Sequence, residues 1–338
     1  MPHRPSLACL PAMLMAAAVC TGFAAQAGQA AEQSTVSLVF VGDIMLDDGP
    51  GQTIAQGQDP FRHVDALLKA ADFRIGNLEC PIATTGQPLD NKIFTFRAKP
   101  SVLPLLKGRF DALSVANNHA GDYGKPAFVE TLDWLKKTGI QAFGGGVNLT
   151  EAHIPLWLHR HGLRIAVLGY NEFKPRSFEA GSNWPGVAWS EDSHVVADIR
   201  AARQAGADII IPFMHWGWER EPTPTERQRQ LARLMIDAGA DAVVGAHPHI
   251  TQGAELYRGK PIIYSLGNFV FDSFTTPATR TGWILRMKLD KQGVVSWTTQ
   301  AVMADEAGTP HPINDGDTPC GQRGITAIQS CGMPRSPS

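Results

Sequence analysis

The stretch VVGAHPHITQG at residues 243–253 joins an apolar run to two histidines with one proline between them. Short continuous apolar runs bounded by turn residues are typical of strands buried on both faces. Two imidazoles at the end of a buried strand indicate that something there binds them. The stretch therefore predicts a buried strand that delivers His247 and His249 to a ligand.

Strand-like and helix-like segments alternate from residue 36 up to this stretch. The expected strands cover residues 36–42, 73–77, 111–117, 164–170, 207–215 and 240–246. The expected helices cover residues 59–72, 100–108, 125–139, 190–206 and 223–239. Alternation of this kind implies parallel pairing, whereas the consecutive strands expected in 255–271 and 283–302 imply an antiparallel or mixed part. The sum predicts an α/β sandwich with its helices outside.

Composition bounds the class of protein. The chain has 338 residues, of which 43% are hydrophobic and 18% charged, with a formal net charge of -2. This is enough chain for one large domain or two small ones, and the balanced charge argues against nucleic acid as a partner. We expect one domain over residues 34–304. From about Asp305 the composition shifts to Pro, Gly and Thr, which predicts a loosely ordered C-terminal tail over residues 305–338.

The first thirty residues have the layout of a secretory signal peptide. Arg4 precedes an apolar stretch from about Leu7 to Ala25, and Ala25-Gln26-Ala27 offers a cleavage site. We therefore expect an exported protein, periplasmic or extracellular. The alternative is an uncleaved segment that keeps the chain associated with a membrane, because the apolar stretch is near spanning length.

Three cysteines remain once Cys9 and Cys20 are assigned to that signal. In an exported chain Cys320 and Cys331 could close a small loop in the tail, although their spacing alone does not decide it. Cys80 would then have no partner and is expected to be a small buried residue.

Polar residues follow most of the expected strands. They are Asp43 after the first, Asn77 and Glu79 after the second, Asn117, Asn118, His119 and Asp122 after the third, His215 and Glu219 after the fifth, His247 and His249 after the sixth, and Asn268 and Asp272 after a later one. Ligands bind beyond the carboxyl ends of parallel strands in open α/β sheets. Residues from six segments are therefore predicted to meet at one site.

The residue types at this site favour a metal centre. Each has a structural alternative when taken singly: Asp43 could cap a turn, and His215 could be a hydrogen-bonded core histidine. Carboxylate, amide oxygen and imidazole together suit divalent Zn, Mn or Fe. A carboxylate can bridge two cations, and a pair about 3.5–4 Å apart serves displacement at phosphorus. The set therefore predicts divalent metal ions, most simply two.

The motifs VGDIMLD, GNLECPI, SVANNHAGDYG, HWGWE, GAHPH and YSLGNFVFD, in this order, resemble the bacterial CapA family. That family is named for poly-γ-glutamate capsule synthesis and belongs to the calcineurin-like metallophosphoesterase superfamily. The resemblance runs from about Leu38 to Asp272. It implies a four-layer α/β/β/α sandwich of the metallophosphoesterase type, with a dinuclear metal centre between its sheets.

The resemblance also implies individual roles. The implied metal ligands are Asp43 and His249 on the first metal, Asn118, His215 and His247 on the second, and Glu79 bridging both. His119 would be the acid that protonates the leaving group. One departure stands out: superfamily phosphatases open with Asp-x-His, whereas Met45 occupies that histidine's position here. The first site would therefore bind its metal weakly or use another ligand, such as Asp47 or Asp122.

These expectations converge on an exported metal-dependent hydrolase, most plausibly phosphoesterase-like, with a role in capsule or envelope polymer (poly-γ-glutamate) biosynthesis. Its substrate would be an anionic small molecule or polymer, and the candidate substrate-binding residues are Lys92, Arg97, Asp122 and Arg280. One alternative is a non-catalytic or weakly catalytic component of a membrane-associated polymer synthase or export complex. Another is a metal-dependent amide hydrolase.

Overall fold

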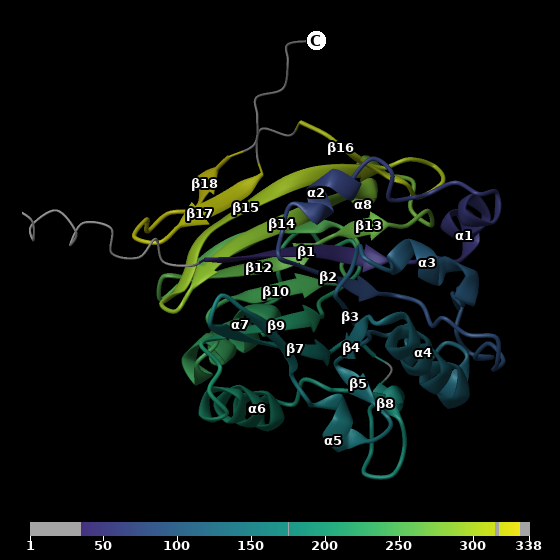
Figure 1. The fold of residues 1–338 in the computed structure, drawn as a ribbon, viewed down its shortest axis with the longest axis horizontal. Helices are drawn as coiled ribbons and strands as arrows, with labels where there is room; N and C mark the ends of the chain where they lie inside the picture. Colours follow the sequence, from purple (N-terminus) through teal and green to yellow (C-terminus); the bar gives the residue numbers. More distant parts are fainter. Residues whose placement is uncertain (1–34, 175, 315–317, 332–338) are drawn as a thin grey trace, which may run out of the picture. The chain divides into compact units, whose positions relative to one another are not determined.

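The computed structural model describes residues 35–174, 176–314 and 318–331. Two sheets carry the fold (Figure 1). The strands of the ten-stranded sheet are β1 (Val36–Ile44), β2 (Phe73–Leu78), β3 (Ala112–Ser114), β4 (Gln141–Phe143), β13 (Asn268–Val270), β14 (Thr281–Asp290), β15 (Gly293–Ala304), β16 (Pro310–Pro312), β17 (Pro319–Gln322) and β18 (Gln329–Ser330). Its order is β18-β17-β15-β14-β1-β2-β3-β4, with β13 beside β1 and β16 beside β15.

The second sheet has six strands in the order β11-β12-β10-β9-β7-β6. They are β6 (Leu156–Arg160), β7 (Leu163–Asn171), β9 (Ile209–His215), β10 (Val243–Ala246), β11 (Thr251–Tyr257) and β12 (Lys260–Leu266). The strands β5 (Gly145–Gly146) and β8 (Gly186–Val187) pair with each other.

Helices cover the outer faces of both sheets. They are α1 (Asp48–Ala55), α2 (Asp65–Lys69), α3 (Leu103–Leu106), α4 (Gly124–Thr138), α5 (Leu149–Ala152), α6 (Asp192–Gln204), α7 (Glu226–Ala238) and α8 (Pro277–Arg280), with the 3-10 turns η1 (Pro100–Val102) and η2 (Arg176–Phe178). A capping box between Thr225 and Gln228 begins α7, and Gly139, at φ 82°, ends α4.

The side-chain alternation of β1 shows how the layers are built. Leu38 and Phe40 lie in the apolar core between the two sheets. Val39 and Val41 point the other way, into the core beneath α2, α3 and α4. A third core lies between the six-stranded sheet and α6 and α7 (Figure 1). The result is the expected four-layer α/β/β/α sandwich.

Parallel pairing brings the carboxyl ends of the central strands to one edge of each sheet. The strand β1 pairs in parallel with β2, with Asp43 opposite Asn77, and β2 pairs in parallel with β3. In the other sheet β9 and β10 are parallel, with His215 opposite Ala246. Within each sheet, the parallel strands therefore end at one edge, as the alternation of elements predicted.

Two element predictions are wrong in extent. The helix expected over residues 59–72 is only α2, because the Asp59 carboxylate accepts the N–H of Phe61 and residues 60–64 form turns instead. The strand expected over residues 111–117 ends at Ser114, where the chain leaves the sheet toward Asn117.

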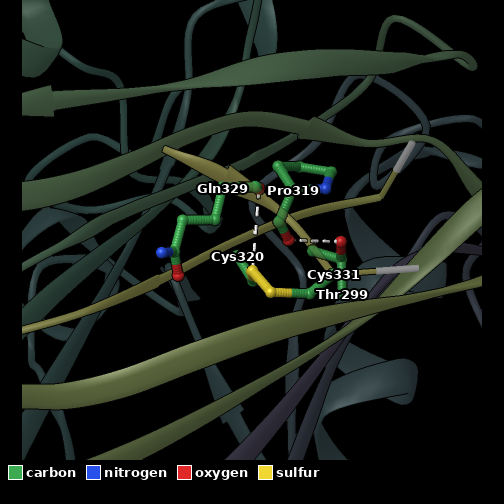
Figure 2. The surroundings of a disulfide bond; sticks show 5 residues. All are labelled: Thr299, Pro319, Cys320, Gln329 and Cys331. Carbon is green, nitrogen blue, oxygen red and sulfur yellow. Dashed lines mark hydrogen bonds between the residues drawn. A yellow bond between two sulfur atoms is a disulfide. The ribbon is translucent and has the colours of Figure 1, made fainter. Parts of the chain in front are cut away.

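The prediction of a loosely ordered tail is wrong for residues 305–314 and 318–331. There β16 and β17 pair antiparallel with β15, and β18 pairs with β17. A disulfide joins Cys320 to Cys331, and the hydroxyl of Thr299 donates to the carbonyl of Pro319 (Figure 2). The long strand β15 thus offers an edge on which the Pro- and Gly-rich segment folds.

The predicted signal peptide, residues 1–30, lies outside the described residues. Within the described part of the chain, we find no helix that is both long and apolar enough to cross a membrane. Cys80 is buried and unpaired, as predicted.

Candidate metal centre

Both sheets contribute to one buried cluster at the joined strand ends. The contributors are Asp43 in β1, Glu79 after β2, Asn118 and His119 after β3, His215 at the end of β9, and His247 and His249 after β10. Each of these side chains is at least nine-tenths buried. The structure therefore brings together all six predicted metal ligands and the predicted acid.

The cluster divides into two groups that share one carboxylate. Glu79, His215 and His247 form one group, and Asp43, Glu79 and His249 form the other, each with ligand atoms within 4.8 Å of one another. An oxygen of Glu79 lies 3.5 Å from Nε2 of His215 and 3.7 Å from Nε2 of His249. Glu79 thus belongs to both groups.

Buried ligand atoms that lack a hydrogen-bond partner show whether these residues fit a cation. Both carboxylate oxygens of Glu79 and Nε2 of His247 are buried and have no hydrogen-bond partner among the described residues. A buried carboxylate without a partner is costly, and a coordinated cation removes that cost. Imidazole and carboxylate donors in this number suit Zn, Mn or Fe. The residues present therefore fit divalent metal ions.

Asn118 and Asn77 complete the polar contacts of the cluster. The side-chain oxygen of Asn118 lies 2.6 Å from Nε2 of His215, so it can join the group of Glu79, His215 and His247. The amide of Asn77 donates to Asp43 at 2.8 Å and lies 3.3 Å from Nδ1 of His215. Asn117 in turn donates to Asn77. Through these contacts the side-chain amides hold the ligand residues in their orientation, as residues that hydrogen-bond to the ligands do in metal sites.

The electrostatics of the metal-free cluster agree with this assignment. Burial, together with the neighbouring Asp43, raises the pKa of Glu79 well above its usual range. Burial and the adjacent imidazoles lower the pKa values of His215 and His247 well below theirs. Both imidazoles are therefore neutral, which is the state in which histidine binds a metal.

The HPH segment reaches the site through an unusual backbone conformation. His247 has φ 99° and His249 has φ 56°, values that non-glycine residues seldom adopt. The N–H of His247 donates to Asp43 at 3.2 Å, and Nδ1 of His249 lies 2.8 Å from the amide oxygen of Asn268. Such strain clusters at functional sites, where the surroundings hold it in place. The segment turns one imidazole toward each group of ligands.

Phenylalanine rings surround the imidazoles. Ring centroids lie 3.9–5.1 Å apart in four pairs, Phe96 with His119, Phe173 with His247, and Phe271 and Phe274 with His249. We call these four residues the phenylalanine collar. By excluding water the collar strengthens every charge interaction inside the cluster.

His119 is held by two charged neighbours. Its Nδ1 lies 2.7 Å from a carboxylate oxygen of Asp122, which also accepts the N–H of Phe96. The ammonium of Lys92 lies 2.5 Å from the other oxygen of Asp122, 3.2 Å from Nδ1 of His119 and 2.7 Å from the carbonyl of Asn118. Lys92 and Asp122 therefore position His119. Lys92 also lines the cavity above His119, so its predicted contact with substrate stays a prediction, as does that of Asp122.

The structure does not bring the two predicted substrate-binding arginines to the cluster. Arg97 donates to the carbonyls of Thr85 and Gly86, and Arg280 donates to the carbonyl of Ala304. Neither contributes to the lining of the cavity above His119. Both predictions rest on the charge of the arginines alone. Charge does not reveal that main-chain carbonyls accept the hydrogen bonds of these guanidinium groups.

The proposed substitute ligands for the first metal are also engaged elsewhere. Asp47 accepts the N–H of Arg97 at 2.7 Å, and Asp122 is paired as described above. Met45 is fully buried in the core, and its sulfur accepts the N–H of Asp47. The first group therefore offers Asp43, Glu79 and His249 and leaves the remaining coordination positions open.

Sequence reasoning missed the wall of the site formed after β7. A cavity of about 700 Å³ opens above Asn118 and His119, with Phe173, Lys174 and Glu219 in its lining. Phe173 and Lys174 follow the strand expected at residues 164–170, the one strand of the alternating set whose end supplied no predicted site residue. The shared position of strand ends was the signal that could have found them.

A four-layer α/β/β/α sandwich with a shared carboxylate at its joined strand ends defines a metallophosphoesterase-like fold. The model of the family described as "Bacterial capsule synthesis protein PGA_cap" matches residues 37–273. The chain therefore belongs to this family of capsule synthesis proteins, which we refer to as the CapA family.

Relatives and a solved structure are similar to this chain as follows. PGA biosynthesis protein CapA of Bacillus subtilis is 37% identical, over 82% of this chain and 74% of the relative. Capsule biosynthesis protein CapA of Bacillus anthracis is 31% identical, over 83% of this chain and 70% of the relative. The NAD nucleotidase NadN of Haemophilus influenzae is 12% identical with a TM-score of 0.46, over 83% of this chain and 54% of that one.

Proposed function

We propose that this protein is an exported, metal-dependent hydrolase of phosphoester bonds that acts in the biosynthesis of a capsule or envelope polymer. The observation that carries the proposal is Glu79, a buried carboxylate that belongs to both ligand groups and whose two oxygens find no hydrogen-bond partner in the described part of the chain. The names of the Bacillus relatives support the setting in polymer biosynthesis. An anionic small molecule or polymer is the substrate class that such a centre would accept.

Two divalent cations, when bound, lower the pKa of water and neutralise charge that develops on a phosphoryl group. The chain's own residues would supply the rest. His119 lines the cavity, and because its Nδ1 faces Asp122, Nε2 is the atom available to protonate the leaving oxygen. General acids of this kind contribute about 10²–10⁴-fold. The phenylalanine collar would keep competing water away.

The disulfide supports export. Cys320 and Cys331 are linked across the β17–β18 hairpin, and such bonds persist in oxidising compartments. We include a periplasmic or extracellular location in the proposal on this ground. Finding the protein in a periplasmic extract with this bond intact would support it, and finding both thiols reduced in the cytoplasm would contradict it.

One observation favours a second candidate function. Met45, buried where superfamily phosphatases carry a histidine, leaves the first ligand group with three side chains. A chain with a weakened first site could serve as a non-catalytic component of a polymer synthase or export complex. The metal content of the purified chain and its turnover of an aryl phosphate separate the two functions.

The test is the metal content of the purified chain by elemental mass spectrometry, together with turnover of an aryl phosphate in the presence of Mn, Zn or Fe. We expect about two metals per chain, and loss of metal and turnover in His247→Ala and Asn118→Ala. The matched control is His159→Ala, because His159 is exposed on β6, away from the cluster. One metal or none, with no turnover under any of these metals, would favour the non-catalytic function.

A further inference from the structure

Exposed apolar side chains gather along one wall of the cavity above His119. In the segment from Leu89 to Phe94, Leu89 is 42% exposed, Ile93 92% and Phe94 63%. All three line the cavity. Soluble proteins seldom leave such a group of apolar side chains in water without a binding role. We call these three residues the apolar rim.

The apolar rim is continuous with the metal centre. Asn118 and His119 lie in the same cavity lining, and Phe173, in that lining too, packs against His247 at a ring distance of 3.9 Å. The rings of Phe173 and Trp218 meet edge to face, and Trp218 is 64% exposed. A ligand with one end at His119 therefore meets the apolar side chains of the rim and of Phe173 in one cavity.

One cationic side chain of the cavity is available to an anionic group. Asp90 and Glu219 also line the cavity and disfavour an anion close to them. Lys174 lines the same cavity and makes no ion pair or side-chain hydrogen bond with the described residues, so its ammonium is available. Lys92 is already paired with Asp122.

We propose that this cavity binds an amphiphilic phosphate monoester, with its phosphate beside His119 and Lys174 and a long apolar chain against the apolar rim and Phe173. The inference rests on the proposed function, because it names the substrate class of that same site. Covering the rim with hydrocarbon would remove apolar area from water on both ligand and protein. Affinity should therefore rise with chain length until the chain extends beyond the rim.

The test uses phosphonates, which are not hydrolysed, so that binding is read independently of turnover. Methyl-, hexyl- and decylphosphonate are titrated calorimetrically, below their micelle concentrations, into the full chain loaded with Mn. We expect affinity to rise by about two- to fourfold per added methylene. The double variant Ile93→Ser/Phe94→Ser should abolish this dependence and leave methylphosphonate binding unchanged. Lys174→Gln should weaken all three probes by one common factor, about tenfold.

Ile154→Ser is the matched control, since Ile154 is 53% exposed beside a different cavity, and it should bind all three probes like the wild type. Equal affinity for the three probes, or an unchanged dependence in the double variant, would overturn the proposal. So would equal binding of a neutral decyl glucoside, which would show that the head group is not recognised. Capture by phosphatidylcholine vesicles without any phosphate monoester would instead assign the rim to a membrane surface.

Failure of this inference and failure of the proposed function give different results. Turnover of an aryl phosphate without any dependence on chain length contradicts the amphiphilic ligand and leaves the hydrolase in place. A dependence on chain length that is lost in the double variant, without turnover of any phosphate ester, supports the binding site and contradicts the hydrolase.

Discussion

Glu79 is fully buried, and neither of its oxygens has a hydrogen-bond partner among the described residues. In the metal-free chain, burial and the nearby Asp43 raise its pKa well above the usual value. The folded state therefore keeps a proton that the unfolded chain releases above about pH 4.5. Because the folded state binds more protons, the free energy of unfolding falls as the pH rises through that range.

Glu79→Gln removes this titration and should flatten the pH dependence of stability in the metal-free chain above the pH at which the unfolded chain loses this proton. The expected difference in slope from the wild type is up to about 1.4 kcal/mol per pH unit, the value for one proton. Urea unfolding at several pH values, with a chelator present, measures it. Identical slopes in the two proteins would show that Glu79 is ionised without a metal.

Lys92 contacts three groups of the acid site, and its side chain is only 19% exposed. Lys92→Met should lower kcat by about tenfold or more, part of what a general acid contributes, with little change in KM. The loss should be greater for phenyl phosphate than for p-nitrophenyl phosphate, because the poorer leaving group depends more on protonation. Lys92→Arg should recover part of kcat, and Lys99→Met, at an exposed lysine, should have no effect. An equal loss for both substrates would contradict a role through His119.

At the scale of elements, the disulfide fixes a hairpin that contributes little apolar core. The strands β17 and β18 have four and two residues, and Cys320 and Cys331 are 11 positions apart. Closing a loop of this size stabilises by about 2–3 kcal/mol in the chain-entropy description.

Cys331→Ser should therefore destabilise this hairpin and leave the metal centre intact. We expect faster amide hydrogen exchange in β17, while β1 and β9 retain their protection and the metal content stays unchanged. Hydrogen exchange read by mass spectrometry provides the measurement. Equal acceleration across both sheets would mean that the hairpin is needed for the whole fold.

The elements that sequence predicted well are those whose burial follows from local pattern. The strands β1, β9 and β10 are apolar runs that reach polar residues at their carboxyl ends: Asp43 is the penultimate residue of β1, His215 is the last of β9, and His247 follows β10. The helix expected over residues 59–72 failed because Phe61, Val64 and Leu68 are all buried, as a helix requires, yet turns bury the first two equally well. Strands β16 to β18 could not be predicted, because their pairing depends on the edge of β15 rather than on their own composition.

The residues of the candidate site could be predicted from the sequence only in part. Its ligand-type residues could be assigned to one place because parallel strands share an edge. The partners of Lys92 and Arg97 could not, since the hydrogen bonds of Arg97 and the salt bridge of Lys92 to Asp122 follow from loop conformation. Phe173 and Lys174 carry no metal-binding chemistry; the cavity and, for Phe173, the ring contact with His247 show that they belong to the site.

At the scale of the whole molecule, each ligand group spans both sheets. Asp43 and Glu79 come from the ten-stranded sheet, whereas His215, His247 and His249 come from the six-stranded one. Bound metal should therefore stabilise the contact between the sheets as well as the site. A ligand present at about a hundred times its Kd adds about 2.7 kcal/mol.

Removing metal with EDTA should accordingly lower the Tm by about 5 °C or more, and added Mn or Zn should restore it. Differential scanning calorimetry gives the shift. His247→Ala should show neither the loss nor the recovery, whereas His159→Ala should show both. An unchanged Tm on chelation of the wild type would contradict a metal that joins the two sheets.

The burial of Cys80 has a consequence for oxidative folding. Beyond residue 34 the chain has three cysteines, and Cys80 lies 240 positions before Cys320 (320 − 80), whereas Cys331 lies 11 after it. Loop closure favours the short pairing by about a hundredfold. Once the core forms, burial raises the pKa of Cys80 to about 12, which suppresses the thiolate that disulfide exchange requires. The three cysteines beyond residue 34 thus form one disulfide, between Cys320 and Cys331, and Cys80 stays a thiol.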